Sequence, residues 1–310
     1  MIRISVIVPT YNDAEGLRTT ARSLLDQDFP AERTEILLVD NGSTDDTFRV
    51  AEELAALEPA RVRALSEREK RGSYAARNRG IAEARGEILC FIDADMSVPP
   101  GYLSAVSAHF ADPECQYAGC FVDIESRIRS LASETDRLLG FPVDGYLQQL
   151  HYAPTCCLSV RATLISTVGP FDPDLFSGGD QEFGRRVHAR GIRQDLLAGV
   201  RLRHPARTRI RDLAKKRRRV ARGHADLVRR YPGRFDDLAS SYRWRRLVRS
   251  VPPRRFRERA RERSVEISRG RSYLLAALQL LLKFIGTREY HRRRRELGRE
   301  HHSDRESTDL

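Results

Sequence analysis

Two aspartates separated by one residue are the part of this sequence best suited to chemistry. Asp93 and Asp95 directly follow the apolar run 88–92, where a buried strand should reach the edge of its sheet. Carboxylates two residues apart at a strand end can face one crevice, where one holds Mg²⁺ or Mn²⁺ and the other a ribose hydroxyl or a metal-bound water. An isolated Asp-x-Asp is more often a solvated turn. The assignment therefore depends on the surrounding sequence.

Strands and helices alternate around these aspartates. Apolar, β-branched runs cover residues 2–8, 35–39, 62–65 and 88–92, and helical patterns run through 17–25, 47–57 and 73–84. Continuously apolar strands that alternate with helices predict an α/β fold with a mostly parallel sheet and helices on both faces. Ligands bind beyond the carboxyl ends of such strands. We therefore expect residues 10–12, Asp40 and 93–95 to line one crevice.

Four motifs in this order resemble those of the family-2 glycosyltransferases, which have the GT-A (Rossmann-like) fold. They are Val-Pro-Thr-Tyr-Asn at 8–12, Val-Asp-Asn-Gly-Ser-Thr-Asp at 39–45, Ala-Arg-Asn at 76–78 and Asp-x-Asp at 93–95. The match covers roughly the first two thirds of the chain, and the ordered set is more specific than any one motif. It implies an inverting enzyme that moves a sugar from a nucleotide-diphosphate sugar to an acceptor hydroxyl.

The resemblance assigns several residues to the donor. Asp40 is suited to accept a hydrogen bond from a base N–H, as uracil offers, or to close an Asx turn, and the resemblance favours the nucleotide and hence a UDP-sugar. Arg71 and Arg77 lie near the predicted amino end of a helix, which attracts anions, so both are candidates for the diphosphate or ordinary surface arginines. The remaining donor contacts expected are Pro9, Thr10, Tyr11, Asn12 and Gly72.

The expected cofactor is a divalent metal, Mn²⁺ or Mg²⁺. A metal on Asp95 would stabilise the departing diphosphate as a Lewis acid, and Asp93 would then face the ribose. His204 follows the strand-like residues 200–202. Some relatives carry a histidine at a similar place that completes the metal shell, although a lone histidine is often structural.

The catalytic base is expected in the segment 176–186, because an inverting transfer needs a base opposite the leaving group. Asp180 begins a predicted helix and is therefore either its N-cap or the base. In the family this place carries a Glu-Asp pair whose aspartate is the base, and here Gly179 replaces the glutamate. We assign the base to Asp180 and place Gly179 and Glu182 on the acceptor side, with Glu182 as the alternative base.

The composition favours a folded protein in a reducing compartment. The chain has 310 residues and 40% hydrophobic content, and its five cysteines lack metal-binding spacing, so we expect buried free thiols. With no signal segment at the start, we expect the cytoplasm or the inner face of the membrane as the location.

Arginine runs concentrate after residue 201, within a net charge of +12. We predict a glycosyltransferase domain at 1–205 (donor half about 1–100, acceptor half about 101–205), a basic helical region at 206–298 and a disordered tail at 299–310. Segment 126–152 is expected to cover the acceptor. The apolar stretch 273–285 is too short to span a bilayer and is either a packed helix or an anchor on an anionic membrane surface.

Two other functions fit parts of the sequence. A nucleotidyltransferase also uses a parallel sheet and a metal-binding Asp-x-Asp, but it would show a Gly-rich basic loop after the first strand. A nucleic-acid-binding role for the arginine-rich region lacks a binding motif and interleaved aromatic residues. We therefore expect a nucleotide-sugar donor and a saccharide, lipid-linked or small-molecule acceptor as partners, and no nucleic acid.

Overall fold

The computed structural model describes residues 1–246, 252–263 and 265–308, and it contains two compact units. The first unit comprises residues 1–125 and 141–205, and the second comprises 126–140 and the chain from 206 onwards. Segment 126–140, which we expected in the first domain, thus belongs to the second unit. The predicted cover at 126–152 is therefore divided between the two units.

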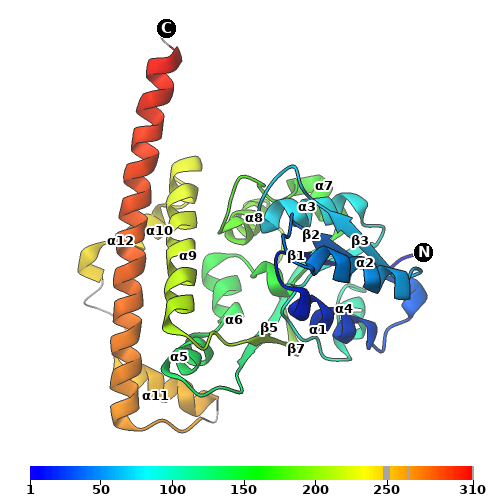
Figure 1. The fold of residues 1–310 in the computed structure, drawn as a ribbon, viewed down its shortest axis with the longest axis horizontal. Coiled ribbons are helices and arrows are strands. Elements are labelled where there is room, and N and C mark those ends of the chain that lie inside the picture. Colours follow the sequence, from blue (N-terminus) through cyan, green and yellow to red (C-terminus); the bar gives the residue numbers. More distant parts are fainter. Residues whose placement is uncertain (247–251, 264, 309–310) are drawn as a thin grey trace. The chain divides into compact units, whose positions relative to one another are not determined.

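A twisted sheet forms the centre of the first unit (Figure 1). Within the described residues it has seven strands in the order β3-β2-β1-β4-β6-β5-β7. Only β6 is antiparallel to its neighbours. The strands are β1 Ile4–Thr10, β2 Thr34–Asp40, β3 Val62–Ser66, β4 Ile88–Phe91, β5 Tyr117–Glu125, β6 Leu158–Arg161 and β7 Asp195–Pro205. The predicted α/β class with a mostly parallel sheet is confirmed.

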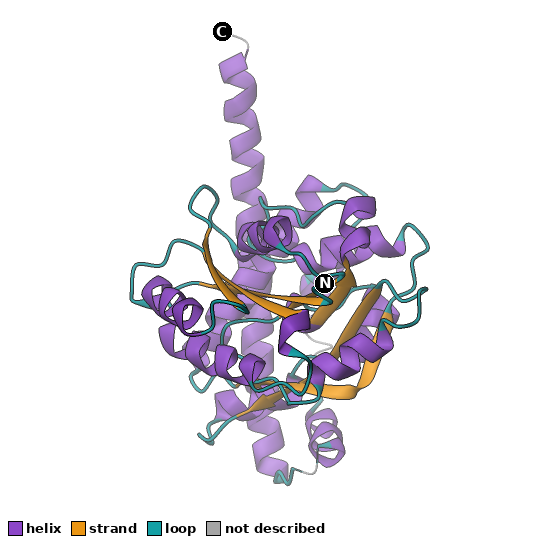
Figure 2. Ribbon diagram, turned by 90° about the vertical axis from the view of Figure 1, so that its right-hand side faces the viewer, coloured by secondary structure: helices purple, strands orange, loops and turns teal. Residues whose placement is uncertain are grey.

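Helices of the first unit cover both faces of this sheet (Figure 2). They are α1 Ala14–Leu25, α2 Thr47–Leu57, α3 Ser73–Glu83, α4 Tyr102–His109, α6 Val143–Gly145, α7 Ala162–Val168 and α8 Gly179–His188, with the short 3-10 and π turns η1 Ala31–Arg33, η2 Tyr146–Leu150 and η3 Thr155–Cys157. The apolar sequence at 155–161 forms the 3-10 turn η3 followed by β6. The five cysteines are buried and free, as predicted.

Close packing of α3 on β1 sets the position of the helix. A Cβ on Gly80 would lie 2.5 Å from the side chain of Ile7, so only glycine allows the helix to approach this closely. Every residue of β1 and β2 is buried, which explains their continuous apolar sequence. The amino end of α3 is thereby held near the carboxyl ends of these strands.

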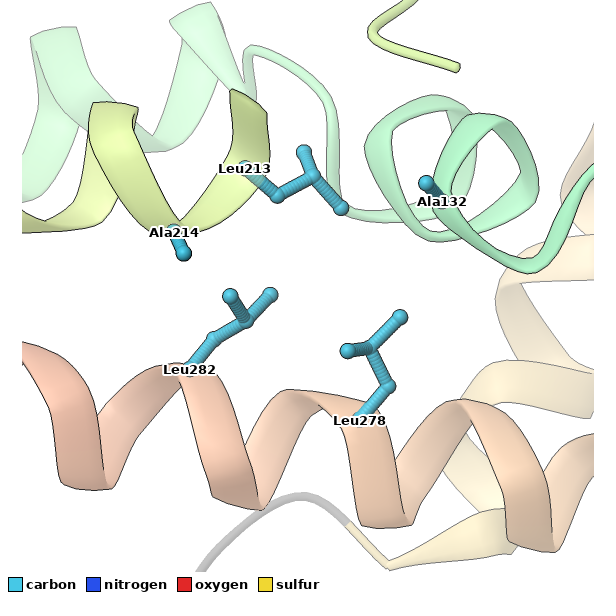
Figure 3. Packing of buried hydrophobic residues seen from close by; sticks show 5 residues of the cluster. All are labelled: Ala132, Leu213, Ala214, Leu278 and Leu282. Carbon is cyan, nitrogen blue, oxygen red and sulfur yellow. The ribbon is translucent and has the colours of Figure 1, made fainter. Parts of the chain in front are cut away.

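The second unit is helical. Its elements are α5 Leu131–Leu139, α9 Ile210–Arg230, α10 Asp236–Ser241, η4 Trp244–Arg246, α11 Pro253–Glu262 and α12 Arg269–Thr308. Leu278 and Leu282 of α12 point toward Leu213, Ala214 and Ala132 and bury this face of the helix (Figure 3). These contacts explain why the segment that contains Ala132 joins the second unit.

The end of the chain differs from the predicted disordered tail. Helix α12 continues through Thr308, and residues 309–310 lie outside the described part. Arg292 pairs with Glu289 and Glu296 at spacings of three and four, which supports a helix in this charged sequence. Among the described helices, none combines the length and the hydrophobicity needed to cross a bilayer.

Candidate active site

The carboxyl ends of β1 and β2 carry two buried polar groups without partners. The strands pair in register, so that Thr10 lies opposite Asp40. Asp40 Oδ2 accepts hydrogen bonds from the N–H groups of Gly42 (3.0 Å) and Ser43 (3.1 Å). Within the described residues, Asp40 Oδ1 and Thr10 Oγ1 are buried without a hydrogen-bond partner, which calls for an explanation in a folded protein. Asp40 thus closes an Asx turn with one oxygen, while its other, buried oxygen lacks a partner within the described residues.

Asn12 connects two loops at this edge of the sheet. Its backbone N–H donates to Ser43 Oγ at 2.9 Å, and its Oδ1 accepts from the Thr44 N–H at 2.8 Å. The positive φ of 50° at Asn12 is a conformation that asparagine tolerates. Pro9 is buried within β1, and the side chain of Tyr11 is 52% exposed. Asn12 therefore shapes the loop, and both Tyr11 and Asn12 are exposed to solvent.

The loop before α3 leaves the amino end of that helix open. Asn41 donates to the carbonyls of Glu67 and Lys70 and accepts from the Gly72 N–H at 2.6 Å. The N-cap is Gly72 at φ 134° and not the predicted Ser73, and no side chain caps the first N–H groups. Arg71 is exposed beside this end. The arrangement suits an anion, because uncapped N–H groups and the helix dipole both attract negative charge.

Arg77 holds Asp93. Its guanidinium donates to Asp93 Oδ1 at 2.6 Å, and its side chain is only 4% exposed, compared with 37% for Asp93. We expected Arg77 as a direct contact to the diphosphate, whereas the structure directs it to a carboxylate. A buried charge-assisted hydrogen bond of this kind fixes the orientation of the partner. Arg77 is thus a positioning residue for Asp93.

Asp95 faces His204 across the sheet edge. The distance from His204 Nε2 to Asp95 Oδ2 is 3.7 Å. His204 Nδ1 lies 2.7 Å from the carbonyl oxygen of Pro205, which can only accept, so Nδ1 carries a hydrogen and, in the neutral ring, Nε2 presents a lone pair. Reciprocal 2.9 Å backbone hydrogen bonds between Ser97 and Arg203 tie the aspartate loop to β7.

An imidazole lone pair and a carboxylate oxygen that face each other fit a divalent cation. Both atoms are acceptors, so they approach favourably when a positive charge lies between them. Mixed carboxylate and imidazole ligands suit Mn²⁺ and related metals. The residues present therefore match the metal site predicted from the sequence.

Asp180 contacts Tyr74 of α3. Its Oδ1 lies 3.4 Å from the Tyr74 hydroxyl and accepts from the Gln181 N–H at 2.9 Å, and its own N–H donates to that hydroxyl at 3.3 Å. The N-cap of α8 is Gly178, at φ 88°, so Asp180 is the second residue of the helix and does not cap it. Its carboxylate is held by partners on two helices.

Gly179 provides the space for the Tyr74 ring. A Cβ at position 179 would lie 2.7, 2.8 and 2.9 Å from three atoms of that ring, closer than carbon atoms pack. Tyr74 is 5% exposed, its ring centroid is 5.7 Å from that of Phe171, and the Arg77 guanidinium lies 5.5 Å above it. The glycine at this position is therefore required by the tyrosine.

The charge of Asp180 also influences nearby tyrosines. Burial raises the pKa of Tyr117 and of Tyr152, and the Asp180 carboxylate raises both further. These phenols are therefore neutral over the physiological range and act as hydrogen-bond donors or apolar walls. Asp180 is consequently the group suited to accept a proton among them.

Glu182 does not fit the acceptor role expected from its position. It is 1% exposed, and its two oxygens accept from Arg186 Nε at 2.8 and 2.9 Å. Arg186 also donates to the Pro170 carbonyl at 2.7 Å. Because α8 has an apolar face that packs inward, the residue two positions after Asp180 is turned into the protein. Glu182 thus has a structural ion pair.

Tyr74 is the site residue that sequence reasoning missed. It lies three positions before Arg77, so both project from one face of α3 and contact the two acidic groups, Asp180 and Asp93 respectively. The spacing of three positions between Tyr74 and Arg77 was the sequence signal that could have identified Tyr74. The helix thereby brings the base candidate and the donor aspartate into one connected site.

Comparisons with known proteins agree with this geometry. A family model described as "Glycosyl transferase family 2" matches residues 5–163. The glycosyltransferase AglE of Haloferax volcanii is 33% identical over 221 residues, which cover 71% of this chain and 72% of that protein. The pre-mycofactocin glycosyltransferase of Mycobacterium tuberculosis is 27% identical over 251 residues, which cover 77% of this chain but only 50% of that protein.

Solved structures share the fold at low identity. The mannosyltransferase PcManGT from Pyrobaculum calidifontis, in complex with GDP-Man and Mn²⁺, aligns with a TM-score of 0.61 at 21% identity, over 93% of this chain and 86% of that one. Residues 1–349 of Staphylococcus aureus TarS, in complex with UDP-GlcNAc, align with a TM-score of 0.54 at 18% identity, over 96% and 92%.

Proposed function

The chain belongs to glycosyl transferase family 2, and on this basis we propose that it transfers a sugar with inversion from a nucleotide-diphosphate sugar to an acceptor hydroxyl. The observation that carries the proposal is the contact of α3 with both acidic groups, through Arg77 to Asp93 and through Tyr74 to Asp180. A displacement reaction needs the donor and the base in one site, at a fixed separation. A rigid helix that contacts both supplies this.

The donor nucleoside would occupy the carboxyl ends of β1 and β2. The unpartnered Oδ1 of Asp40 can accept a base N–H, and Thr10 Oγ1 can donate or accept. Uracil offers such an N–H, and a TarS structure of this fold contains UDP-GlcNAc. We therefore favour a UDP-sugar, with the diphosphate near Arg71 and the uncapped start of α3, and the ribose at Asp93.

Asp95 and His204 would hold a divalent metal, and PcManGT contains Mn²⁺ beside its nucleotide sugar. When bound, such a metal neutralises the negative charge that develops on the leaving diphosphate. The Pro205 carbonyl fixes the His204 tautomer, so Nε2 is ready to bind without rearrangement. The hydrogen bonds of Ser97 hold Asp95 opposite this nitrogen.

Asp180 would take the proton from the acceptor hydroxyl as that oxygen attacks the anomeric carbon. Tyr74 and the Gln181 N–H orient its carboxylate. Gly179, beside Asp180, makes room for the Tyr74 ring that orients this carboxylate. The acceptor class would be a saccharide, a lipid-linked or polysaccharide precursor, or a small molecule, used in the cytoplasm or at the inner face of the membrane.

The test combines donor binding with transfer. A panel of UDP-, GDP- and dTDP-sugars, with and without Mn²⁺, should raise the melting midpoint only for the true donor, because ligands stabilise the state that they bind. Asp180→Asn should abolish transfer and retain the donor-induced shift. Asp26→Asn, at an exposed aspartate that ends α1, is the matched control and should leave both unchanged. Near-wild-type turnover by Asp180→Asn would remove the base from this proposal.

A further inference from the structure

One face of α12 is apolar and open to solvent. Tyr273, Leu274, Leu280, Leu281 and Phe284 have exposed fractions of 65%, 53%, 42%, 49% and 46%. Their spacings of three, four and seven place them on one side of the helix. Exposed large apolar residues are usually scattered singly, and a continuous row of them indicates an interaction surface. We call these five residues the apolar face of α12.

The apolar face is not needed for the fold of the second unit. Leu275, Leu278 and Leu282 lie on the other side of the helix, are at most 5% exposed and form its packed core. Figure 3 shows Leu278 and Leu282 directed toward α9 and α5. A surface helix normally has one apolar side. Apart from a contact of Phe284 with Trp244, the second apolar side of α12 is therefore left open by the packing of this unit.

Arginines border the apolar face at both ends. Arg269 is exposed on the turn before it, and Arg288 and Arg295 are exposed on the turns after Phe284. Trp244 of η4, 47% exposed, packs against Phe284 with the ring centroids 5.7 Å apart. Tryptophan and tyrosine beside arginine are characteristic of the boundary between lipid headgroups and acyl chains.

We propose that the apolar face of α12 binds an anionic lipid surface, with the helix in the plane of the membrane. The leucines and Phe284 would enter the boundary between headgroups and acyl chains, and the flanking arginines would contact lipid phosphates. Residues 273–284 extend about 17 Å along the helix axis, which suits an in-plane helix. Charge complementarity selects this occupant, because the apolar face requires an apolar partner and the flanking arginines require an anionic one.

A second copy of the chain fits this surface less well. In a two-fold interface the same patch meets itself. Arginines lie at both ends of the apolar face, so either a parallel or an antiparallel pairing brings Arg288 close to Arg288 or to Arg269 of the other copy. Like charges at such an interface are unfavourable. An anionic bilayer neutralises both ends at once.

Flotation of the full chain with vesicles tests the proposal. We expect binding to vesicles of phosphatidylcholine with 30% phosphatidylglycerol, at least tenfold weaker binding to pure phosphatidylcholine, and loss of binding as salt screens the arginines. The triple variant Leu274→Gln, Leu281→Gln and Phe284→Gln should bind at least tenfold more weakly. Its matched control is Leu57→Gln, at a residue of α2 that is 76% exposed, which should bind as the wild type does.

A second variant separates surface chemistry from folding. Arg288→Gln with Arg295→Gln leaves the apolar face intact and should weaken binding to the anionic vesicles by about fivefold for each arginine, since each contributes about 1 kcal/mol near such a surface. Circular dichroism melting should match the wild type for each variant used. The proposal is overturned if the triple variant binds anionic vesicles like the wild type, if neutral vesicles bind equally well, or if the wild type ignores vesicles and forms a dimer that the triple variant loses. None of these assays requires transferase activity.

Discussion

Gly179→Ala is the substitution whose effect can be worked out most directly from the geometry. The added Cβ would lie 2.7 Å from Tyr74 Cε2, against at least 3.4 Å for an ordinary contact, so ring or helix must move by about 0.7 Å. The ring is held between Phe171 and Arg77 and is 5% exposed. Overpacking of such a site costs about 1–3 kcal/mol of unfolding free energy.

The same movement would disturb the proposed base. The contact between the Tyr74 hydroxyl and Asp180 Oδ1 is already 3.4 Å long, so a displacement of this size breaks it. Misplacement of a catalytic group by about 1 Å can lower the rate by about 100-fold. We therefore expect Gly179→Ala to lower kcat by one to two orders of magnitude, with little change in donor binding.

Urea unfolding and steady-state transfer assays, arranged as a double-mutant cycle, measure both effects. In a Tyr74→Leu background the obstruction is gone, so Gly179→Ala should cost less than about 0.5 kcal/mol there, which gives a coupling energy of at least about 0.5 kcal/mol. Gly145→Ala is the matched control. Its φ is −65° and its added Cβ would have no neighbour nearer than 4.0 Å, so it should be neutral or slightly stabilising. An equal cost of Gly179→Ala in both backgrounds would refute the steric reasoning.

Three further predictions follow from ion pairs and ligands. Glu182→Gln should lower the free energy of unfolding by about 2 kcal/mol, because it removes the charged partner of the partly buried Arg186, whereas Glu53→Gln on α2 should not shift the urea midpoint. Burial lowers the pKa of Lys216 to about 8, so between about pH 8 and 10.5 the unfolded chain holds a proton that the folded chain lacks. The free energy of unfolding, compared with that of Lys216→Met, should therefore rise with pH by about 2 kcal/mol across this window, a value reduced because 27% of the side chain is exposed. A difference between the two proteins that does not change with pH in chemical denaturation would contradict this. His204→Gln should weaken Mn²⁺-dependent stabilisation by the donor at least tenfold in a thermal-shift titration, and unchanged Mn²⁺ dependence would exclude His204 as a ligand.

The proposed site also explains why family motifs in this chain are separated by long intervals. The residues proposed to contact the donor and the acceptor come from strand ends and helix starts, where the backbone offers free polar groups and the side chains face one edge of the sheet. Most of the chain between them builds the sheet and its covering helices. The arginine-rich second unit provides the separate surface on α12.

Local sequence patterns determined most of the first unit. The apolar runs at 88–92 and 35–39 predict buried strands because alternation and turn chemistry act over a few residues, and the strands place Asp40, Asp93 and Asp95 at one edge without further information. The family resemblance rested on the same short motifs and is confirmed by the family match at 5–163. The buried free cysteines also followed from composition alone.

Contacts between distant residues were decided only by the tertiary structure. Tyr74 and Asp180 are 106 positions apart, so no local pattern could show that one orients the other or that Gly179 makes room for the ring. Arg77 and Glu182 each looked available for a ligand, and each proved to be buried and paired with an oppositely charged side chain. The sequence specifies which residues are apolar or charged within a helix, but which of two apolar sides of α12 becomes the core depends on where α9 packs, and that is a property of the folded chain.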